Sequence, residues 1–353
     1  MKTLLVTGGA GFIGSNFILK QLSETDNVII NLDKLTYAGN LENLNSVADH
    51  KRYHFVQGDI TDSDLIESII KKYQPDGVIH FAAESHVDRS IDGPMPFIMT
   101  NLVGTAILLD RLNHYWRNLN DEKKNIFRFL HVSTDEVFGS LGMDEKFELD
   151  TPYDPSSPYS ASKAGSDHLV RAWNRTFDFP ILITNCTNNY GPYQFPEKLI
   201  PLMVINAISG KALPVYGSGE NVRDWLHVED HCDAIYNAFT DGKTGDTYLI
   251  GGEEEVTNIR VVETICEILD EIQALESGKS YKQQITYVTD RPGHDLRYAM
   301  DISKIRSELG WNPKNSFVSG LKQTIEWYLK NRDWWETLQQ KKIYEQERLG
   351  KQA

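Results

Sequence analysis

A short apolar strand that runs straight into a glycine-rich turn is the feature that most restricts the fold of this chain. Thr3–Thr7 is an apolar run, and Gly8, Gly11 and Gly14 follow it at intervals of three in the string TGGAGFIGS. Gly14–Gln21 then has the apolar spacing of a helix. A strand, such a turn and a helix begin a doubly wound α/β sheet, in which the turn lies against the phosphates of a dinucleotide.

The first half of the chain continues with short apolar runs that alternate with amphipathic stretches. This alternation is typical of a parallel sheet with helices on both faces. The predicted strands are Thr3–Thr7, Val28–Asp33, His54–Gln57, Gly77–Phe81, Phe127–Ser133 and Ile181–Asn185. The predicted helices between them are Gly14–Gln21, Asp62–Tyr73, Thr100–Trp116 and Ser160–Thr176. We therefore predict a doubly wound, Rossmann-type α/β fold.

From about residue 188 the composition shifts, which predicts a second and more irregular lobe. Pro, Gly and Tyr gather in Tyr190–Pro196 and Pro214–Gly219, whereas Leu226–Phe239 and Thr247–Ile250 again have the patterns of a helix and a strand. We therefore predict interleaved lobes. A dinucleotide-binding lobe would comprise residues 1–187 and about 225–250, a smaller ligand-binding lobe about 188–224 and 251–330, and a charged tail or helix 331–353.

An acidic residue at the end of the second predicted strand indicates which dinucleotide binds. Asp33 lies at the distance from the glycine turn where a carboxylate accepts hydrogen bonds from the adenosine ribose. A carboxylate there repels the 2′-phosphate of NADP, so the pattern predicts NAD. Alone, Asp33 could equally be a helix cap or a turn residue. Asp59 and Ile60, after the third strand, are a weaker candidate contact for the adenine, because strand-end Asp often caps the next helix.

Composition argues against several classes of function. The chain has 50 acidic and 36 basic residues and a net charge of −14, which disfavours a nucleic-acid partner because phosphate neutralisation needs clustered Lys and Arg. Cys186, Cys232 and Cys266 have no C-x-x-C spacing, so we expect neither a disulfide framework nor a zinc knot. We find no signal-like segment and no apolar run near the ~20 residues of a membrane span. We expect a soluble, cytoplasmic protein.

Two groups of residues are candidates for catalysis. Tyr159 and Lys163 lie four residues apart on a predicted helix and so share one face, where an ammonium could lower the pKa of the phenol. Thr134, Asp135 and Glu136 end a predicted strand, and two acids there could divide general-acid and general-base work. The alternatives are a surface Tyr–Lys pair, and a solvated turn in which Asp135 caps a helix.

Longer strings resemble those of a known family. The glycine turn and the Tyr-x-x-x-Lys pair are similar to those of the extended short-chain dehydrogenase/reductase superfamily. Within this superfamily, the chain resembles the nucleotide-sugar 4,6-dehydratases. The strings that carry this resemblance span nearly the whole chain: DKLTYAGNLENL, AAESHVDRS, STDEVFG, NNYGPYQFPEKLIP, GENVRDWLHVEDH and DRPGHDLRYAMD. The sugar 4-epimerases of this superfamily lack the paired acids, because they only oxidise and reduce C4.

The resemblance implies that dTDP-glucose is converted to its 4-keto-6-deoxy derivative, with tightly bound NAD recycled at each turnover, to supply deoxysugar synthesis such as that of rhamnose. Tyr159 would take the O4 proton, Lys163 would hold the nicotinamide ribose, and Thr134 would bond O4. Glu136 would take the C5 proton, and Asp135 would protonate the leaving hydroxyl.

The resemblance also implies which residues contact the ligands. Those expected to contact NAD are Gly8, Gly11, Phe12, Ile13, Gly14, Asp33, Lys34, Asp59, Ile60, Ala82, Tyr159 and Lys163. Those expected to contact the nucleotide sugar are Ser85, Thr134, Asn189, Lys198, Leu199, Tyr216, Arg223, Asn258 and Arg291. A homodimer through Thr100–Trp116 and Ser160–Thr176 is the family's usual assembly.

Other interpretations remain open from the sequence. A sugar-nucleotide 4-epimerase or C6 decarboxylase would share the fold, and a regulator that binds NAD without catalysis would keep the glycine turn. His50 with His54, and His227 with His231, have metal-like spacing but no third ligand, so we predict no metal site. Arg89 is expected to order the loop around it.

Overall fold

A seven-stranded parallel sheet forms the centre of the larger lobe. Its strands are β1 (Thr3–Thr7), β2 (Val28–Asp33), β3 (Tyr53–Gln57), β4 (Gly77–His80), β5 (Arg128–Thr134), β6 (Ile181–Cys186) and β10 (Thr247–Ile250). They lie in the order β10-β6-β5-β4-β1-β2-β3, and all neighbours are parallel. The structure is a computed structural model that describes residues 1–142, 144–290 and 294–340. The predicted Rossmann-type fold is confirmed.

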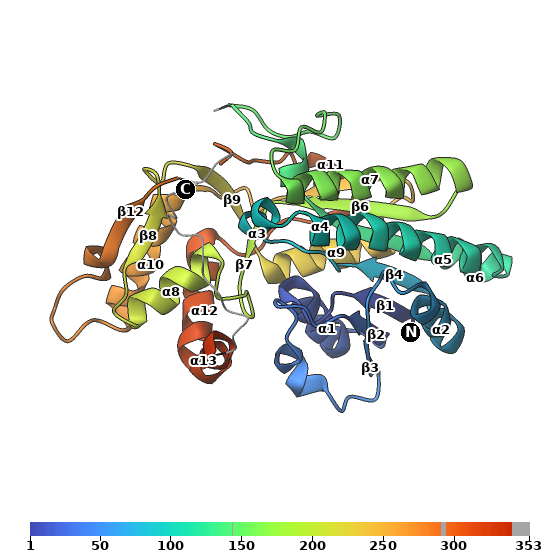
Figure 1. The fold of residues 1–353 in the computed structure, drawn as a ribbon, viewed down its shortest axis with the longest axis horizontal. Coiled ribbons are helices and arrows are strands. Elements are labelled where there is room, and N and C mark those ends of the chain that lie inside the picture. The colour runs from blue at the N-terminus through green and yellow to red at the C-terminus, as the bar shows by residue number, and fades with distance from the viewer. Residues whose placement is uncertain (143, 291–293, 341–353) are drawn as a thin grey trace.

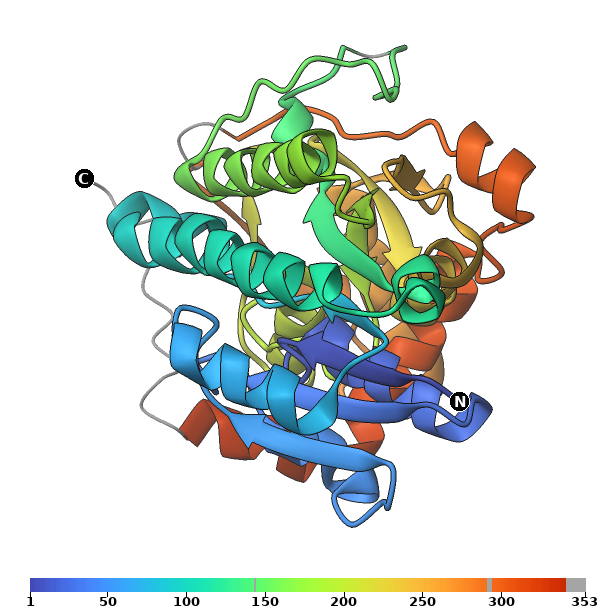
Figure 2. The same cartoon turned by 90° about the vertical axis from the view of Figure 1, so that its right-hand side faces the viewer.

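Helices cover both faces of this sheet (Figure 1). One face carries α1 (Phe12–Glu24), α9 (Val228–Asp241) and α11 (Ser303–Leu309), and the other carries α2 (Ser63–Tyr73), α5 (Thr105–Arg117) and α7 (Pro158–Phe177). Side chains alternate between these layers as a pleated strand requires: Leu4 and Val6 join the α1–α9 core, and Leu5 joins the α2–α5–α7 core. Figure 2 shows α5 in teal and α7 in green side by side.

The helix predicted over Thr100–Trp116 begins earlier than expected. It starts with α4 (Met95–Phe97), passes through a π-helical turn at Ile98–Gly104 and continues as α5. By length and composition alone, the 23-residue helix Met95–Arg117 could cross a membrane, contrary to our expectation that no apolar run is long enough. Here it packs against α2 and α7 over the sheet.

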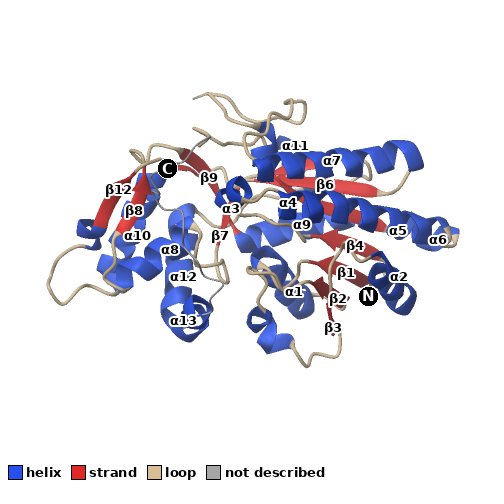
Figure 3. Cartoon of the chain, in the orientation of Figure 1, coloured by secondary structure: helices blue, strands red, loops and turns tan. Residues whose placement is uncertain are grey.

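The second lobe contains two small sheets (Figure 3). One has β7 (Asn188–Tyr190), β9 (Val222–His227) and β11 (Glu255–Thr257), and the other pairs β8 (Leu213–Tyr216) with β12 (Ile285–Val288). Their apolar side chains pack with α8 (Leu199–Ile208), α10 (Asn258–Ile272), α12 (Phe317–Lys330) and α13 (Arg332–Gln340). Short helical segments complete the chain: α3 (Val87–Asp92), α6 (Asp121–Ile126), η1 (Leu41–Val47), η3 (Asp135–Phe138) and η4 (Tyr281–Gln284).

The chain returns to the first sheet after entering the second lobe. β10 pairs with β6 from Thr247 opposite Ile183 to Ile250 opposite Cys186. The prediction that a helix starts at Leu226 is wrong for two residues. Leu226 and His227 belong to β9, which pairs with both β7 and β11, and the helix starts at Val228. The interleaved domain boundaries, including the tail over 331–353, stay a prediction; residues 341–353 lie outside the described part of the chain.

Candidate active site

A pocket lies at the carboxyl ends of β1, β2, β4 and β5, at the edge where ligands bind in open α/β sheets. It brings together all the residues that the sequence assigned to the cofactor. They are Gly8, Gly11, Phe12, Ile13, Gly14, Asp33, Lys34, Asp59, Ile60, Ala82, Tyr159 and Lys163. Thr134, Asp135 and Glu136 line the same pocket, as do Ser85, Asn189 and Lys198. Their individual roles stay predictions.

The glycine turn is packed so closely that side chains are excluded from it. Gly8 has φ +71°, and a Cβ there would lie 2.6 Å from the amide nitrogen of Ala82. A Cβ on Gly14 would lie 2.3 Å from the carbonyl oxygen of Gly8. The backbone of the turn and the first residues of α1 therefore face the pocket uncovered, which fits a pyrophosphate at a helix N-terminus.

Two carboxylates lie along the same side of the pocket. Asp33 accepts hydrogen bonds from the backbone N–H groups of Ala10 (2.9 Å) and Leu35 (2.8 Å), so it fastens the glycine turn to the end of β2. Burial raises the pKa of Asp33, and these two bonds oppose the rise. Asp59 pairs with Lys34 at 2.6 Å. The alternative that Asp59 caps the next helix is wrong, because Asp62 is the N-cap of α2.

We expect alanine substitutions in the turn to separate packing from cofactor binding. Gly14→Ala should lower the melting temperature by several degrees, because its methyl group meets backbone atoms. Gly11→Ala should keep the melting temperature, because the nearest atom to its Cβ is the Gly8 oxygen at 3.3 Å, yet should retain less NAD on purification. Thermal unfolding and the NAD content of the purified proteins measure the two effects. Equal melting temperatures for the two variants would contradict this account.

The N-terminus of α7 positions the tyrosine and the lysine. Ser157 and Ser160 form a capping box around Pro158, which places Tyr159 in the first turn of the helix. Lys163, one turn later, donates from Nζ to the carbonyl oxygen of Val132 at 2.8 Å. The alternative of a surface Tyr–Lys pair is wrong, since both residues are buried and face the pocket.

The electrostatics of Tyr159 differ from the sequence prediction. Burial raises its pKa well above the usual value, the charge of Glu136 raises it further, and a hydrogen bond to Thr134 opposes the rise. We predicted a pKa lowered by the adjacent ammonium, and this prediction is wrong in its direction, because burial raises the pKa of Tyr159. A nearby positive charge, such as the ammonium of Lys163, favours the phenolate.

The end of β5 delivers the acid pair into the pocket. Thr134 is the N-cap of η3: its hydroxyl accepts from the backbone N–H of Glu136 at 3.3 Å and donates to Oδ1 of Asp135 at 3.1 Å. Asp135 is 2 % exposed. Burial raises its pKa well above the usual value, and the charge of Glu136 adds to the rise. A protonated Asp135 beside Glu136 supplies an acid and a base at one strand end. The solvated helix-cap alternative for Asp135 is therefore wrong.

A second pocket continues from the first into the smaller lobe. Ser85, Glu136 and Lys198 line both pockets, and Leu199, Tyr216, Arg223 and Asn258 line the second. Arg291 lies outside the described residues. The guanidinium of Arg223 donates to the carbonyl oxygens of Val222 (2.8 Å) and Asp295 (2.9 Å) and lies 4.2 Å from the ring centroid of Tyr298. With the first residue of α10 beside it, this arrangement could bind a diphosphate.

Sequence reasoning missed a cluster where the lobes meet. The Arg89 guanidinium lies 3.7 Å from the ring centroid of Tyr37, and Arg89 Nε lies 3.9 Å from a carboxylate oxygen of Glu197. The Tyr37 hydroxyl donates to Glu197 at 3.1 Å. Arg89 therefore joins three segments beside the pocket, and the expectation that it orders the loop around it stays a prediction. Nothing in the local spacing of these residues predicts the contact, because they come from distant parts of the chain.

No group of three or more His, Cys, Asp or Glu side chains that could hold a metal ion occurs in residues 1–142, 144–290 and 294–340.

A Rossmann-type sheet whose strand ends gather a glycine turn, a Tyr-x-x-x-Lys pair and two adjacent acids defines a NAD-dependent sugar-nucleotide dehydratase of the extended short-chain dehydrogenase/reductase type. Residues 5–324 match the family model described as GDP-mannose 4,6 dehydratase, and the chain belongs to that family.

Particular relatives narrow the comparison. The chain is 57% identical over 344 residues to dTDP-glucose 4,6-dehydratase of Shigella flexneri, with 95% of each chain covered. The structure is also similar to a crystal structure of DesIV, a dTDP-glucose 4,6-dehydratase from Streptomyces venezuelae with NAD and TYD bound. The two chains are 45% identical, with a TM-score of 0.87, and the match covers 95% of this chain and 99% of that one. UDP-glucose 4-epimerase of Thermotoga maritima has a TM-score of 0.83 but only 27% identity, over 94% of this chain and 99% of that one.

Proposed function

We propose that the chain is a dTDP-glucose 4,6-dehydratase, which converts dTDP-D-glucose into dTDP-4-keto-6-deoxy-D-glucose and water. The observation that carries the proposal is the placement of Asp135 and Glu136 in the same pocket as Tyr159 and Lys163. A 4-epimerase needs no acid pair there. The relatives named for this activity, at 57% and 45% identity, support the same choice over the 27% identical epimerase.

The first half of the reaction prepares the sugar for elimination. Bound NAD⁺ would supply the acceptor for the C4 hydride and later return that hydride to C6, so that no net oxidation occurs. Tyr159, once ionised, takes the proton from O4, while the Thr134 hydroxyl bonds the same oxygen. Lys163 lies one helical turn after Tyr159 and lines the same pocket, where it would hold the nicotinamide ribose of the cofactor.

The second half removes water from C5 and C6. The C5 proton is too weakly acidic to remove until C4 is a ketone, so oxidation must come first. Glu136 then takes the C5 proton, and Asp135 gives its proton to the C6 hydroxyl, which leaves as water. The raised pKa of Asp135 fits the role of a donor, because it keeps the carboxyl protonated before the reaction. Glu136 finally returns a proton to C5.

A product assay tests the proposed function. Purified protein incubated with dTDP-glucose should release a 4-keto-6-deoxy sugar with no net NADH, measured by mass spectrometry and absorbance. UDP-glucose and GDP-glucose, assayed in parallel, test the choice of base. Recovery of dTDP-galactose would favour the epimerase. The decarboxylase is tested in a separate incubation with a nucleotide-linked uronic acid, from which it would form a pentose.

Three further features belong to this proposal. We infer a cytoplasmic enzyme that forms a homodimer through the outer faces of α5 and α7, and that supplies deoxysugar synthesis, with rhamnose as the expected end product. The family resemblance supports each of these features.

A further inference from the structure

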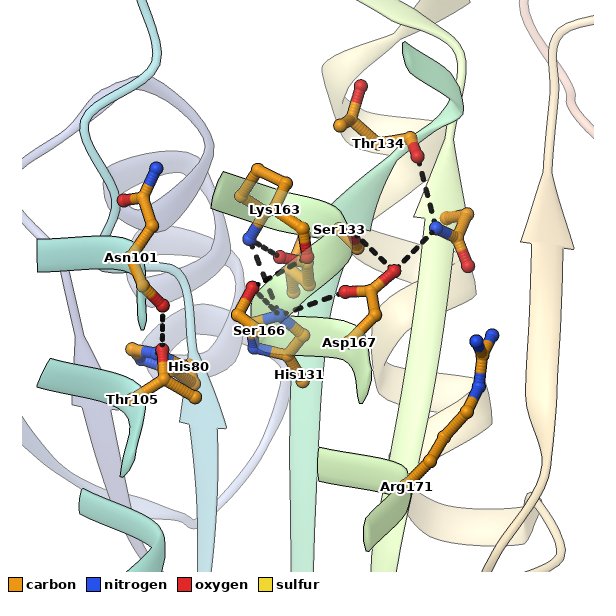
Figure 4. A network of polar contacts seen from close by, with 12 residues as sticks. His80, Asn101, Thr105, His131, Ser133, Thr134, Lys163, Ser166, Asp167 and Arg171 are labelled. Carbon is orange, nitrogen blue, oxygen red and sulfur yellow. Dashed lines mark hydrogen bonds and ion pairs between the residues drawn. The ribbon is translucent and has the colours of Figure 1, made fainter. Parts of the chain in front are cut away.

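A buried polar cluster lies directly beneath the catalytic pair, on the side away from the pocket. Figure 4 shows Lys163, His131 and Asp167 pointing toward one another from α7 and β5. Asp167 and His131 are 0 % and 1 % exposed. The proposed reaction uses neither residue. Four residues of α7 at intervals of four, Tyr159, Lys163, Asp167 and Arg171, lie on one face of the helix, so the catalytic face extends two turns into the core.

Asp167 is held as a carboxylate by donors from several elements. Its Oδ2 accepts from Ser133 Oγ (2.9 Å), from the Tyr153 hydroxyl (2.8 Å) and from Asn185 Nδ2 (3.2 Å). Its Oδ1 lies 3.2 Å from Nε2 of His131. Although burial alone would raise its pKa, His131, Lys163 and Ser133 lower it below the usual value. A fully buried carboxylate with this many donors stays ionised.

His131 lies between the carboxylate and the ammonium. Its Nε2 is 3.4 Å from Lys163 Nζ as well as 3.2 Å from Asp167 Oδ1. Lys163 has its other hydrogen bond to the carbonyl of Val132, and it forms no ion pair within 4.0 Å among the described side chains. Both charged groups therefore approach the same ring nitrogen of His131, and the negative charge that compensates the buried ammonium lies just beyond that atom.

The groups that face Lys163 come from several elements, and most of them are uncharged. His131 on β5 is neutral, because burial lowers its pKa to about 4. His80 on β4, whose ring centroid is 5.2 Å from that of His131, has a pKa well below the usual value for the same reason. The Cys186 thiol on β6 is held neutral by burial, which raises its pKa. Asp167 remains as the ionised partner, with Arg171 joined to it through Tyr153.

We propose that Asp167, whose carboxylate lies beside the same nitrogen of His131 as the ammonium, is a positioning residue that keeps Lys163 protonated and holds it in the pocket. Burial lowers the pKa of Lys163 to about 8, and the charge of Asp167 opposes that fall. Without the carboxylate, Lys163 would lose its proton at a lower pH and could no longer stabilise a phenolate. This inference deepens the proposed function, since it concerns the same Tyr–Lys pair.

The test is a direct titration of Lys163 in the full chain. Protein labelled with [13C]lysine is followed by NMR as the pH is raised, and the Lys163 signal is identified by its loss in Lys163→Met. In Asp167→Asn, which keeps the shape but removes the charge, the midpoint should fall by about one unit or more. The matched control is Tyr153→Phe, which removes one hydrogen bond to Asp167 but not its charge, and should leave the midpoint in place.

The outcomes separate this inference from the proposed function. An unchanged midpoint in Asp167→Asn, or an equal fall in Tyr153→Phe, would overturn it. If Asp167→Asn does not fold, Asp167→Ser is measured instead: it also removes the carboxylate charge, and the midpoint should again fall. An unmoved midpoint there also overturns the inference. The titration needs no turnover, so its result does not depend on the product assay with dTDP-glucose.

Discussion

Replacing Asp135 by Asn and Glu136 by Gln together is expected to lower turnover by ~10²–10⁴-fold while C4 oxidation continues. Neither amide can give or take the proton that elimination requires, but Tyr159 and Lys163 remain. The variant should therefore accumulate bound NADH when mixed with dTDP-glucose, seen as NADH absorbance that stays with the protein.

The control for this variant removes two carboxylate charges at another place in the chain. Glu148→Gln with Asp150→Asn removes two exposed carboxylates a short distance along the chain and should turn over like the parent. Parent-like turnover of the Asp135/Glu136 variant would show that the acid pair has been assigned the wrong role. A low rate without bound NADH would place the defect before elimination.

Tyr159→Phe is expected to lower turnover by a similar ~10²–10⁴-fold, with a different signature. The ring stays in place beside Phe97, whose centroid is 6.3 Å away, so the fold should be kept. Without the hydroxyl, the O4 proton loses its acceptor, so C4 oxidation becomes the slow step. This variant should show no bound NADH after mixing with dTDP-glucose, in contrast to the acid-pair variant.

The raised pKa of Tyr159 adds a pH dependence that can be checked in the parent. Because burial and nearby carboxylates disfavour the phenolate, the rate of C4 oxidation should rise with pH until the tyrosine is ionised in the complex. Tyr287→Phe, at a tyrosine that is 62% exposed, is the control and should leave the rate unchanged. If Tyr159→Phe accumulated bound NADH, C4 oxidation would not need the hydroxyl, and the assignment of Tyr159 as the base would be wrong.

Much of the larger lobe could be predicted because its signals are local. Strand edges were predicted to within one residue, since apolar runs bounded by turns report buried parallel strands directly. The long helix begins before Thr100 although Pro94 and Pro96 are typical of a helix boundary: Pro94 is the N-cap of α4, and Pro96 lies in its first turn. Leu226 was placed in a helix because a short apolar run does not distinguish a helix from a buried strand.

Prediction from the sequence is weakest for polar residues in the core. His131 and Asp167 are invisible to periodicity, because a strand His and a helix Asp are usually exposed. Their roles depend on β5 and α7 lying against each other. The spacing of four from Lys163 to Asp167 was a usable signal, since it extends the same helix face. The pKa of Tyr159 could not be predicted, because it depends on burial and on charges brought in by Glu136.

The late arrival of β10 has a consequence for synthesis of the chain. Until Ile250 has emerged from the ribosome, the sheet can hold only six strands, and β6 presents an unpaired edge. Such an edge can pair with other nascent chains. The first lobe is therefore not a finished unit when its glycine turn and catalytic residues have all been made, and a gene fragment ending near residue 187 would leave that edge permanently open.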